Sequence, residues 1–411
     1  MALSWKVAVS STVQSLRCFS APIFYKDDPL LVAKASMQYL YDEEGRKYLD
    51  CISNVQHVGH CHPTVVSMIS QQLATSTCNV RFVSPALTEA AEQILATLPG
   101  LDTVLFVNSG SEANDLALRL CRDYTKNYDA IVVDHAYHGH VTTTMQMSPY
   151  KFDHGSSLAR PEWVHAPCPD VFRGKFRLPD EQLRDEAKLA VMGLVYADEV
   201  KDIIKKGESS GRKVAMFISE ALQSCGGQTG YGRVGASFWA HQLHKDGFVP
   251  DIVTMGKPMG NGFPVSAVVT RREIADTLGG EYGGNPVSCS AVLGVLRVIR
   301  EENLLEHSEN MGKLFHKKLT SLMERHDCIG DVRGVGQFWG LDLVKDRSTR
   351  EPNTQLALTL ILKARQEKGV LISADGPHSN IIKFKPPLCF DEANLDEAVA
   401  AIDACLRELG Y

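Results

Sequence analysis

The amino-acid sequence predicts an α/β fold, with a large domain on a mostly parallel sheet and a smaller C-terminal α/β domain. The first observation is that several short apolar, β-branched runs end in small or charged residues and lead into helical repeats, which is typical of βα units. The second is the length of 411 residues, which exceeds what one hydrophobic core usually serves. We expect a leader over residues 1–22, an N-terminal segment over 23–62, the large domain over 63–303 and the small domain over 304–411.

The composition is that of an ordinary globular protein, with 44% hydrophobic residues, 22% charged residues and a formal net charge of -6. No basic stripe favours nucleic acid, and no apolar run is long enough to span a bilayer. Residues 1–26 lack acidic side chains, contain Lys6, Arg17 and Lys26 and are rich in serine, which is typical of a mitochondrial transit peptide. A disordered leader is the alternative, so we expect a mitochondrial or a cytoplasmic protein.

Two short strands around a turn are predicted for residues 39–50, because aromatic and apolar residues flank a Glu-Gly pair. The next loop contains His57, His60, Cys61 and His62, whose side chains are all possible zinc ligands. Glycine and proline interrupt this loop, and no matching pair of ligands follows it. We therefore favour a structural or active-site loop over a metal site and expect no metal.

The stretch from Val104 to Asp115 predicts a buried strand that turns sharply into a helix. The turn contains Ser109, Gly110 and Ser111, where free backbone amides and the positive end of the helix dipole favour a phosphate. The alternative is a plain helix cap, in which a serine hydroxyl accepts hydrogen bonds from first-turn amides.

Two further strands end in candidate site residues. Residues 130–134 lead to Tyr137 and His138, where an aromatic ring followed by glycine can lie flat against a planar ligand. Residues 214–220 end in Glu220, at the sheet edge where α/β proteins place their chemistry. Ordinary packing is the alternative for the tyrosine and histidine, and a helix-capping acid for the glutamate.

Lys257 is the predicted chemical centre of the chain. It follows an apolar strand over residues 252–255 and precedes a stretch rich in glycine and proline. Partial burial there disfavours the ammonium form and leaves an amine that can condense with an aldehyde. A surface lysine in a turn is the alternative.

Six stretches occur in one order and together resemble the class III aminotransferases, which are pyridoxal-phosphate enzymes of fold type I. These are residues 108–114, 137–139, 220, 228–235, 256–262 and 282–286. The similarity runs from about Phe24 to the C-terminus. Within the family, residues 197–200, 223–228, 255–262 and 373–378 are similar to phospho-lyases that act on ethanolamine phosphate or 5-phosphohydroxylysine.

The resemblance implies that pyridoxal 5'-phosphate is bound at this site. Lys257 would hold its aldehyde, and Tyr137 would stack on its ring. Arg233 corresponds to a structural partner near the carboxylate that lies beside the ring. The full set of expected cofactor-binding residues is Ser109, Gly110, Ser111, Tyr137, His138, Glu220 and Lys257.

Lys383 and Lys385 are the expected substrate-binding residues. Family members that act on amino acids have an arginine in this strand, which binds the substrate carboxylate, whereas this chain has lysines. An ammonium is a point charge rather than a bidentate fork, so it suits a phosphate at least as well as a carboxylate. Two surface lysines on an edge strand are the alternative.

The expected activity is a phospho-lyase reaction in a homodimer. The resemblance implies that the freed Lys257 removes a proton from the amine-bearing carbon, after which a phosphate on the adjacent carbon leaves. Ethanolamine phosphate would then give acetaldehyde, ammonia and phosphate. An amine transaminase would instead return the proton to the cofactor, and it is the alternative within the enzyme class.

Two segments of the family pattern are missing from this chain. Relatives have a helix and a strand ending in Asp-Glu-Val-Gln before Thr229, and that aspartate keeps the pyridine nitrogen protonated; Asp198 and Glu199 lie in a polar helix and do not replace it. Relatives also have Asn-Thr before Tyr282, where this chain has Glu281. We expect a shortened form with severely reduced activity. A non-catalytic dimeric scaffold is a further alternative, and a zinc-binding protein is the third.

Overall fold

The computed structural model describes residues 24–25, 28–53, 55–153, 155, 163–221, 223, 233–243, 246–278 and 283–411. The predicted leader, the junction of Gln228 with Thr229 and the stretch from Gly279 to Tyr282 lie outside the described residues. Within the described ranges, no helix is long and apolar enough to cross a membrane.

The first sheet of the large domain has three antiparallel strands. Its central strand is β9 (Ser266–Thr270), which pairs with β4 (Thr103–Val107) on one side and with β8 (Ile252–Met255) on the other. Side chains of β9 alternate between two hydrophobic clusters, with Ala267 and Val269 in one cluster and Val268 in the other. This sheet is therefore packed on both faces.

The second sheet of the large domain has three parallel strands. Its central strand is β5 (Asp129–Val133), which pairs with β6 (Trp163–Ala166) and β7 (Val214–Ile218). All five residues of β5 are buried, as expected for a parallel strand covered on both faces.

The prediction of one mostly parallel sheet is wrong in this respect, because the described strands form two sheets and only the second is parallel. The reason lies partly in the connection between β8 and β9. Only residues 256–265 separate them, and a short connection of this kind joins antiparallel strands, whereas parallel strands need a longer crossover.

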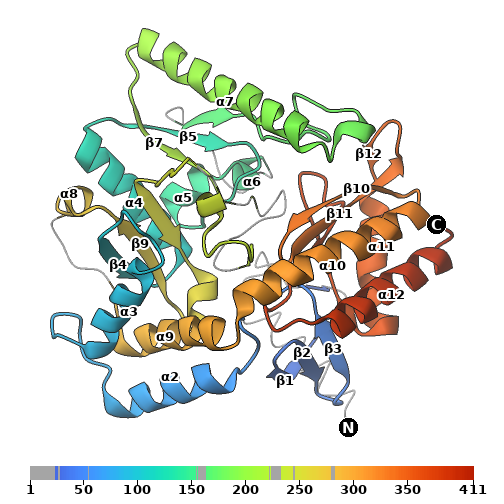
Figure 1. Cartoon of the computed structure of the whole chain (residues 1–411), viewed down its shortest axis with the longest axis horizontal. Coiled ribbons are helices and arrows are strands. Elements are labelled where there is room, and N and C mark those ends of the chain that lie inside the picture. The colour runs from blue at the N-terminus through green and yellow to red at the C-terminus, as the bar shows by residue number, and fades with distance from the viewer. Residues whose placement is uncertain are drawn as a thin grey trace.

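Helices cover both faces of the first sheet (Figure 1). On one face, α9 (Pro286–Glu301) packs against α2 (Pro63–Thr75) and α3 (Pro85–Leu95). The sequence of α9 is apolar on nearly all sides, so the helix is buried. On the other face, α4 (Gly110–Thr125) packs against β4, β9 and β8 and also against β7 of the second sheet. The remaining helices of the large domain are α5 (Thr142–Gln146), α6 (Pro149–Phe152), α7 (Glu186–Ser209) and α8 (Arg272–Ala275).

The small domain is an antiparallel sheet covered by helices. Its strands are β10 (Ile329–Val335), β11 (Phe338–Asp346), β15 (Ile381–Phe384) and β14 (Ser373–Asp375) in that order, with β12 (Glu351–Pro352) paired to β11. Its helices are α10 (Leu304–Arg325), α11 (Thr354–Lys363) and α12 (Glu392–Glu408). Phe315 of α10 stacks on Trp339 and Phe390 in its core.

The N-terminal strands join the small domain. The antiparallel strands β1 (Val32–Ser36), β2 (Tyr39–Asp42) and β3 (Lys47–Asp50) continue into β13 (Val370–Leu371), which pairs with β3 in parallel. The two strands predicted within residues 39–50 are therefore confirmed. The backbone amide of Lys385 also donates to the carbonyl of Cys51, so this segment is tied to the strand that carries the two predicted substrate lysines.

Candidate functional site

Four strand ends of the large domain meet at one place. The backbone amide of Tyr137, which follows β5, donates to Oε1 of Glu220, which follows β7, at 2.9 Å. The Nζ atom of Lys257, which follows β8, lies 5.7 Å from the centre of the Tyr137 ring. A Cβ atom added at Gly256 would lie only 3.2 Å from the Cα atom of Gly110, at the start of α4. The residues predicted from separate stretches of the chain are thus brought together.

Lys257 is accessible to solvent at the end of β8. Its side chain is reached by solvent, yet protein atoms surround it on most sides. This burial lowers the pKa of its ammonium group. The nearby charge of Glu220 raises the pKa and so opposes the shift, whereas the charge of Lys383 lowers it further. Its backbone has a φ of 21°, which is unusual for a residue other than glycine and is found most often at functional sites.

The N-terminus of α4 forms an anion cradle. The hydroxyl of Ser109 accepts from the Glu112 amide at 3.2 Å, and the Glu112 carboxylate accepts from the amides of Asn108 and Ser109 at 2.7 and 2.9 Å. This capping box leaves the amides of Gly110 and Ser111 with no hydrogen-bond partner among the described residues. Ser109 therefore caps the helix, which is the alternative given in the sequence analysis. The free amides of Gly110 and Ser111 are left to bind a phosphate.

The loop after β5 is held against this cradle. The Ser111 hydroxyl accepts from the His140 amide at 2.9 Å, and the Asn114 side chain donates to the His138 carbonyl at 2.7 Å. The His138 amide in turn donates to the Ser148 hydroxyl at 2.8 Å. Sequence reasoning missed Asn114 and Ser148, although Asn114 stands one turn into α4, where a polar side chain faces the same edge of the sheet.

Gly139 lets the loop approach the cradle, so its replacement by alanine is expected to be destabilising. Its φ is +139°, and an added Cβ would lie 2.5 Å from the Thr144 hydroxyl and 2.7 Å from the Ser111 hydroxyl. Backbone strain and overpacking together are expected to lower the free energy of unfolding by about 2 to 4 kcal/mol, as measured by urea denaturation. Gly45→Ala is the matched control, because Gly45 has a φ of +81° and no atom within 4 Å, so it should lose only about 1 to 2 kcal/mol.

His138 is buried, and its Nε2 atom has no hydrogen-bond partner in the described part of the chain. Burial lowers the pKa of its ring to about 4 from the usual 6.5, so the ring is neutral at physiological pH. The contact with the cofactor that the resemblance implies stays a prediction. The neutral state has a consequence for stability that can be measured.

The unfolded chain binds a proton at His138 below pH 6.5, whereas the folded chain binds it only near pH 4. The free energy of unfolding is therefore expected to fall by about 2 to 3 kcal/mol between pH 6.5 and pH 4.5 through this residue alone. Urea denaturation at the two pH values measures the loss. A His138→Gln variant should lose that much less stability over the same interval, and an equal loss in both proteins would contradict the assignment.

Lys383 and Lys385 lie at alternate positions on and just after β15, so both side chains point to one face. Both are buried, so the alternative of surface lysines is wrong. Lys383 forms an ion pair with Asp375 of the neighbouring strand β14. Lys385 lies 5.1 Å over the Phe338 ring, and burial, with the charges of Lys383, Arg233 and Lys257, holds the pKa of its ammonium well below its usual range.

Arg233 contacts the loop that follows β15. Its guanidinium is fully buried and donates to the carbonyl of Pro386, and a second nitrogen lies 3.4 Å from Nδ1 of His57. Its role near the ring-side carboxylate, which the resemblance implies, stays a prediction. Burial lowers the pKa of Arg233 to about 10.

The histidine loop is not assembled as a metal site. His60 Nε2 lies 2.7 Å from Asp50, and His62 Nε2 lies 3.0 Å from Glu302, so each ring is directed to a different carboxylate. No group of three or more candidate ligands could hold a metal among the residues that the structure describes. The backbone amide of Val58 donates to the side chain of Asn261, which lies in the turn after Lys257. The loop thus supports the site structurally.

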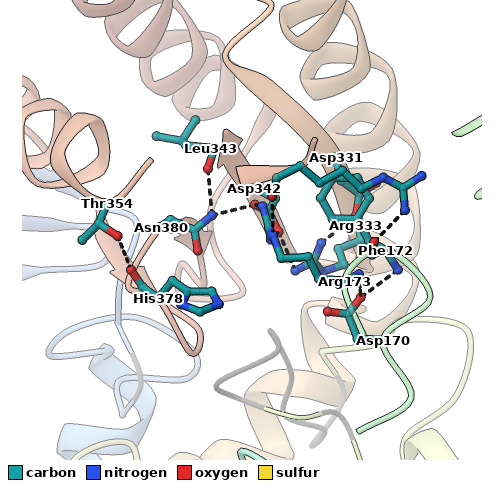
Figure 2. Close-up of polar contacts among 11 residues, drawn as sticks. Asp170, Phe172, Arg173, Asp331, Arg333, Asp342, Leu343, Thr354, His378 and Asn380 are labelled. Carbon is teal, nitrogen blue, oxygen red and sulfur yellow. Dashed lines mark hydrogen bonds and ion pairs between the residues drawn. The ribbon is translucent and has the colours of Figure 1, made fainter. Parts of the chain in front are cut away.

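A cavity of about 820 Å³ lies beside the site, between the carboxyl ends of β5, β6 and β7 and the small domain, with Glu220 in its wall. A polar cluster in and behind this wall joins the two domains (Figure 2). Asp342 is fully buried, and it accepts two hydrogen bonds from Arg173, one from Arg333 at 3.2 Å and one from Asn380 at 2.7 Å. Sequence reasoning missed this cluster, because its members are far apart in the sequence. Only the fold brings segment 170–173 and the small domain together.

The residues present fit pyridoxal phosphate in three respects. Free amides and a helix dipole are suited to its phosphate, the Tyr137 ring can lie against its ring, and a lysine with a lowered pKa faces the same space. In the fourth respect, a carboxylate for the pyridine nitrogen, the family's aspartate is missing from the sequence. Oε1 of Glu220 accepts the Tyr137 amide, so this carboxylate also holds the backbone after β5.

Comparison with known proteins agrees with this geometry. The profile described as aminotransferase class-III matches residues 24–227 and 228–406, and its division falls one residue before the junction of Gln228 with Thr229, where the sequence analysis expects a missing βα unit. The chain is 62% identical to "Ethanolamine-phosphate phospho-lyase homolog 1" of Caenorhabditis elegans, over 93% of this chain and 90% of that protein, and 44% identical to "Alanine--glyoxylate aminotransferase 2-like" of Drosophila melanogaster, over 93% and 84%. A phospholyase from Arthrobacter in complex with phosphoethanolamine superposes with a TM-score of 0.85 at 31% identity, covering 97% of this chain and 99% of that one. The chain belongs to the class III aminotransferase family of pyridoxal-phosphate-dependent enzymes.

Proposed function

We propose that this chain binds pyridoxal phosphate through Lys257 and is a phospho-lyase for a small phosphorylated amine such as ethanolamine phosphate. The observation that carries the proposal is the buried pair Lys383 and Lys385, which faces the space in front of Lys257. The relatives named as phospho-lyases, one of them bound to phosphoethanolamine, support the same substrate class.

The charge at the site favours a dianionic ligand. Four cations, Lys257, Lys383, Lys385 and Arg233, lie near one another, and Lys383 is neutralised by Asp375. The carboxylate of Glu220 acts on Lys257 and Lys385, and that of Asp50 acts on Arg233. Because an uncompensated buried charge costs several kcal/mol, a bound phosphate would stabilise the cluster. Lys385, which has no ion pair among the described residues, is best placed to bind it.

Each residue has a distinct task in this proposal. The amides of Gly110 and Ser111 bind the cofactor phosphate, the hydroxyl of Ser111 orients the loop that carries Tyr137, and the Tyr137 ring supports the cofactor ring. Pyridoxal phosphate, when bound, supplies an electron sink for the amine-bearing carbon. Lys257 moves the proton of that carbon, for which an amine of lowered pKa is suited. Lys385 holds the substrate phosphate and offsets its charge as it leaves.

Product analysis tests the proposed reaction. Purified protein with added pyridoxal phosphate should release phosphate and acetaldehyde in equal amounts from ethanolamine phosphate without any keto acid. Formation of glycolaldehyde phosphate, with conversion of an added keto acid to its amino acid and no free phosphate, would identify an amine transaminase, which the name of the Drosophila relative favours. A faster reaction with 5-phosphohydroxylysine would change the substrate and keep the reaction class. A colourless protein without either product would identify the scaffold.

Replacing Lys385 by glutamine is expected to raise the KM for ethanolamine phosphate by about 10- to 100-fold, because a charge-assisted contact contributes about 1.5 to 3 kcal/mol. Lys385→Arg keeps the charge and should retain most of the affinity. Lys345→Gln is the control, since Lys345 is exposed and pairs with Glu351 far from the site. A KM that is unchanged in Lys385→Gln would remove this residue from the substrate site and leave the cofactor assignment intact.

We also infer that the chain acts as a homodimer. Phe82 and Val83, which precede α3, expose 68% and 95% of their surface, a large apolar exposure for adjacent residues. Gly284, at the start of α9, packs beside Val80 and Leu87, so this exposed segment lies close to the end of β4 and the site. Light scattering of the purified protein gives the mass, and a monomer would contradict the inference. Import into mitochondria through residues 1–22 likewise stays a prediction.

A further inference from the structure

The strands β7 and β8 are the two sides of a break in the large domain. Each pairs with one neighbour among the described strands, β7 with β5 and β8 with β9. The same helix, α4, packs against both of them. Both strands also end at one place, because Glu220 follows β7, Lys257 follows β8 and the two charges act on each other. The strands therefore run in the same direction, and each has one edge without a partner among the strands that the structure describes.

An apolar side chain of β7 is left exposed to solvent. Met216 is buried beneath α4, but the next residue, Phe217, is 50% exposed on the opposite face. Helix α7 lies over this part of the molecule (Figure 1), yet only Tyr196 of its residues is buried, while Val191 and Leu194 are 56% and 69% exposed. An aromatic side chain in the middle of a strand is normally packed. The open edge and the open apolar face thus coincide.

The match to the family model is interrupted in the segment between β7 and β8. It divides between residues 227 and 228, which lie between β7 and β8 in the chain, next to the junction where the sequence analysis expects a missing βα unit. The phospholyase from Arthrobacter superposes on this chain with a TM-score of 0.85 over 97% of its length. The break is therefore a place where a strand is expected and the surrounding scaffold is already in position.

We propose that the break between β7 and β8 is a binding site for an extended apolar peptide strand supplied by another polypeptide. The backbone groups of both edges would pair with the added strand, as in recognition by strand addition, and alternate apolar side chains would cover Phe217. The lengths of β7 and β8, five and four residues, set the length of the bound segment.

Charge sets the direction of the bound strand. The carboxyl ends of β7 and β8 open onto Lys257 and Lys385, whose ammonium groups act on each other there. A strand that runs parallel to both edges places its C-terminal end at these cations, so an acidic end is favoured and a basic end is repelled. The chemistry that fits is an apolar strand ending in a carboxylate. This inference rests on the fold and holds whether or not the protein turns over substrate.

Hydrogen exchange of the full-length protein tests the proposal. The probe is acetyl-Lys-Ser-Val-Ile-Val-Val-Asp with a free C-terminal carboxylate. We expect it to slow amide exchange at least tenfold in fragments that cover β7 and β8, and to leave the outer edge strands β4 and β6 unchanged. The same peptide with alternate N-methylated amides, and one ending in lysine amide, should have no effect.

A substitution separates strand pairing from general apolar binding. Phe217→Lys should weaken the binding of the probe at least tenfold, measured by fluorescence anisotropy of a labelled peptide. Val66→Lys is the matched control, because Val66 is 47% exposed on α2, away from the break. Equal slowing of exchange in β4 and β6, protection by the N-methylated peptide, equal loss of binding in the two variants, or no protection at all would each overturn the proposal.

Discussion

Lys257→Ala is expected to abolish both the yellow absorbance of protein-bound pyridoxal phosphate and all turnover of ethanolamine phosphate. The amine is the group that condenses with the cofactor aldehyde and moves the substrate proton, and no other amine lies in the same position. Loss of a nucleophile that also acts as the base removes at least the 10²- to 10⁴-fold contribution typical of general base catalysis. Absorbance of the dialysed protein, together with phosphate release, measures both effects.

Lys385→Ala is the matched comparison for this variant. Lys385 is also a buried lysine with a lowered pKa, and its charge acts on Lys257. It should nevertheless retain the yellow absorbance, because its amine lies beside Phe338 and not over Tyr137. Loss of colour in Lys385→Ala with retention in Lys257→Ala would reverse the assignment of the two lysines. Unchanged thermal unfolding of both variants without cofactor shows that the fold is intact.

The second large effect is expected on repair of the chain. Insertion between Gln228 and Thr229 of the residues that the Caenorhabditis elegans relative has there should raise kcat by about 10²- to 10³-fold. A preorganised charge at the reacting group contributes about 2.7 to 4 kcal/mol, and each 1.4 kcal/mol is tenfold in rate. The insertion is also expected to add a strand between β7 and β8. Phosphate release under saturating substrate measures the change.

Two controls separate the reasons for that gain. A glycine-serine linker of equal length should leave kcat unchanged, because it supplies neither a strand nor a carboxylate. The same insertion with asparagine in place of its aspartate should restore thermal stability without restoring kcat. If the original chain already turns over at the rate of the repaired one, the expected electrostatic loss is wrong.

The local elements could be predicted from the sequence because each one depends on a short pattern. The apolar run 104–107 and the small-residue turn after it predict β4 and the N-terminus of α4, and both are confirmed. The strands that end near Tyr137, Glu220 and Lys257 are confirmed in the same way. In a βα protein, a strand that ends in a polar residue indicates where its side chain will lie.

The arrangement of strands could not be predicted in the same way. Whether β9 pairs parallel or antiparallel depends on its neighbours, and its sequence is equally apolar in both cases. The Arg173, Arg333 and Asp342 cluster also escaped prediction, because no short-range spacing links residues on separate domains. Lys383 and Lys385 were identified through the resemblance, but their burial and the pairing of Lys383 with Asp375 required the fold.

The buried carboxylate of Asp342 has a consequence for motion. Removing one partner from a buried charge costs about 3 to 5 kcal/mol, and Asp342 would lose both hydrogen bonds from Arg173 if segment 170–173 separated from the small domain. Charges this deep are hardly screened by dissolved ions. The contact between Arg173 and Asp342 is therefore expected to hold segment 170–173 against the small domain with little dependence on ionic strength.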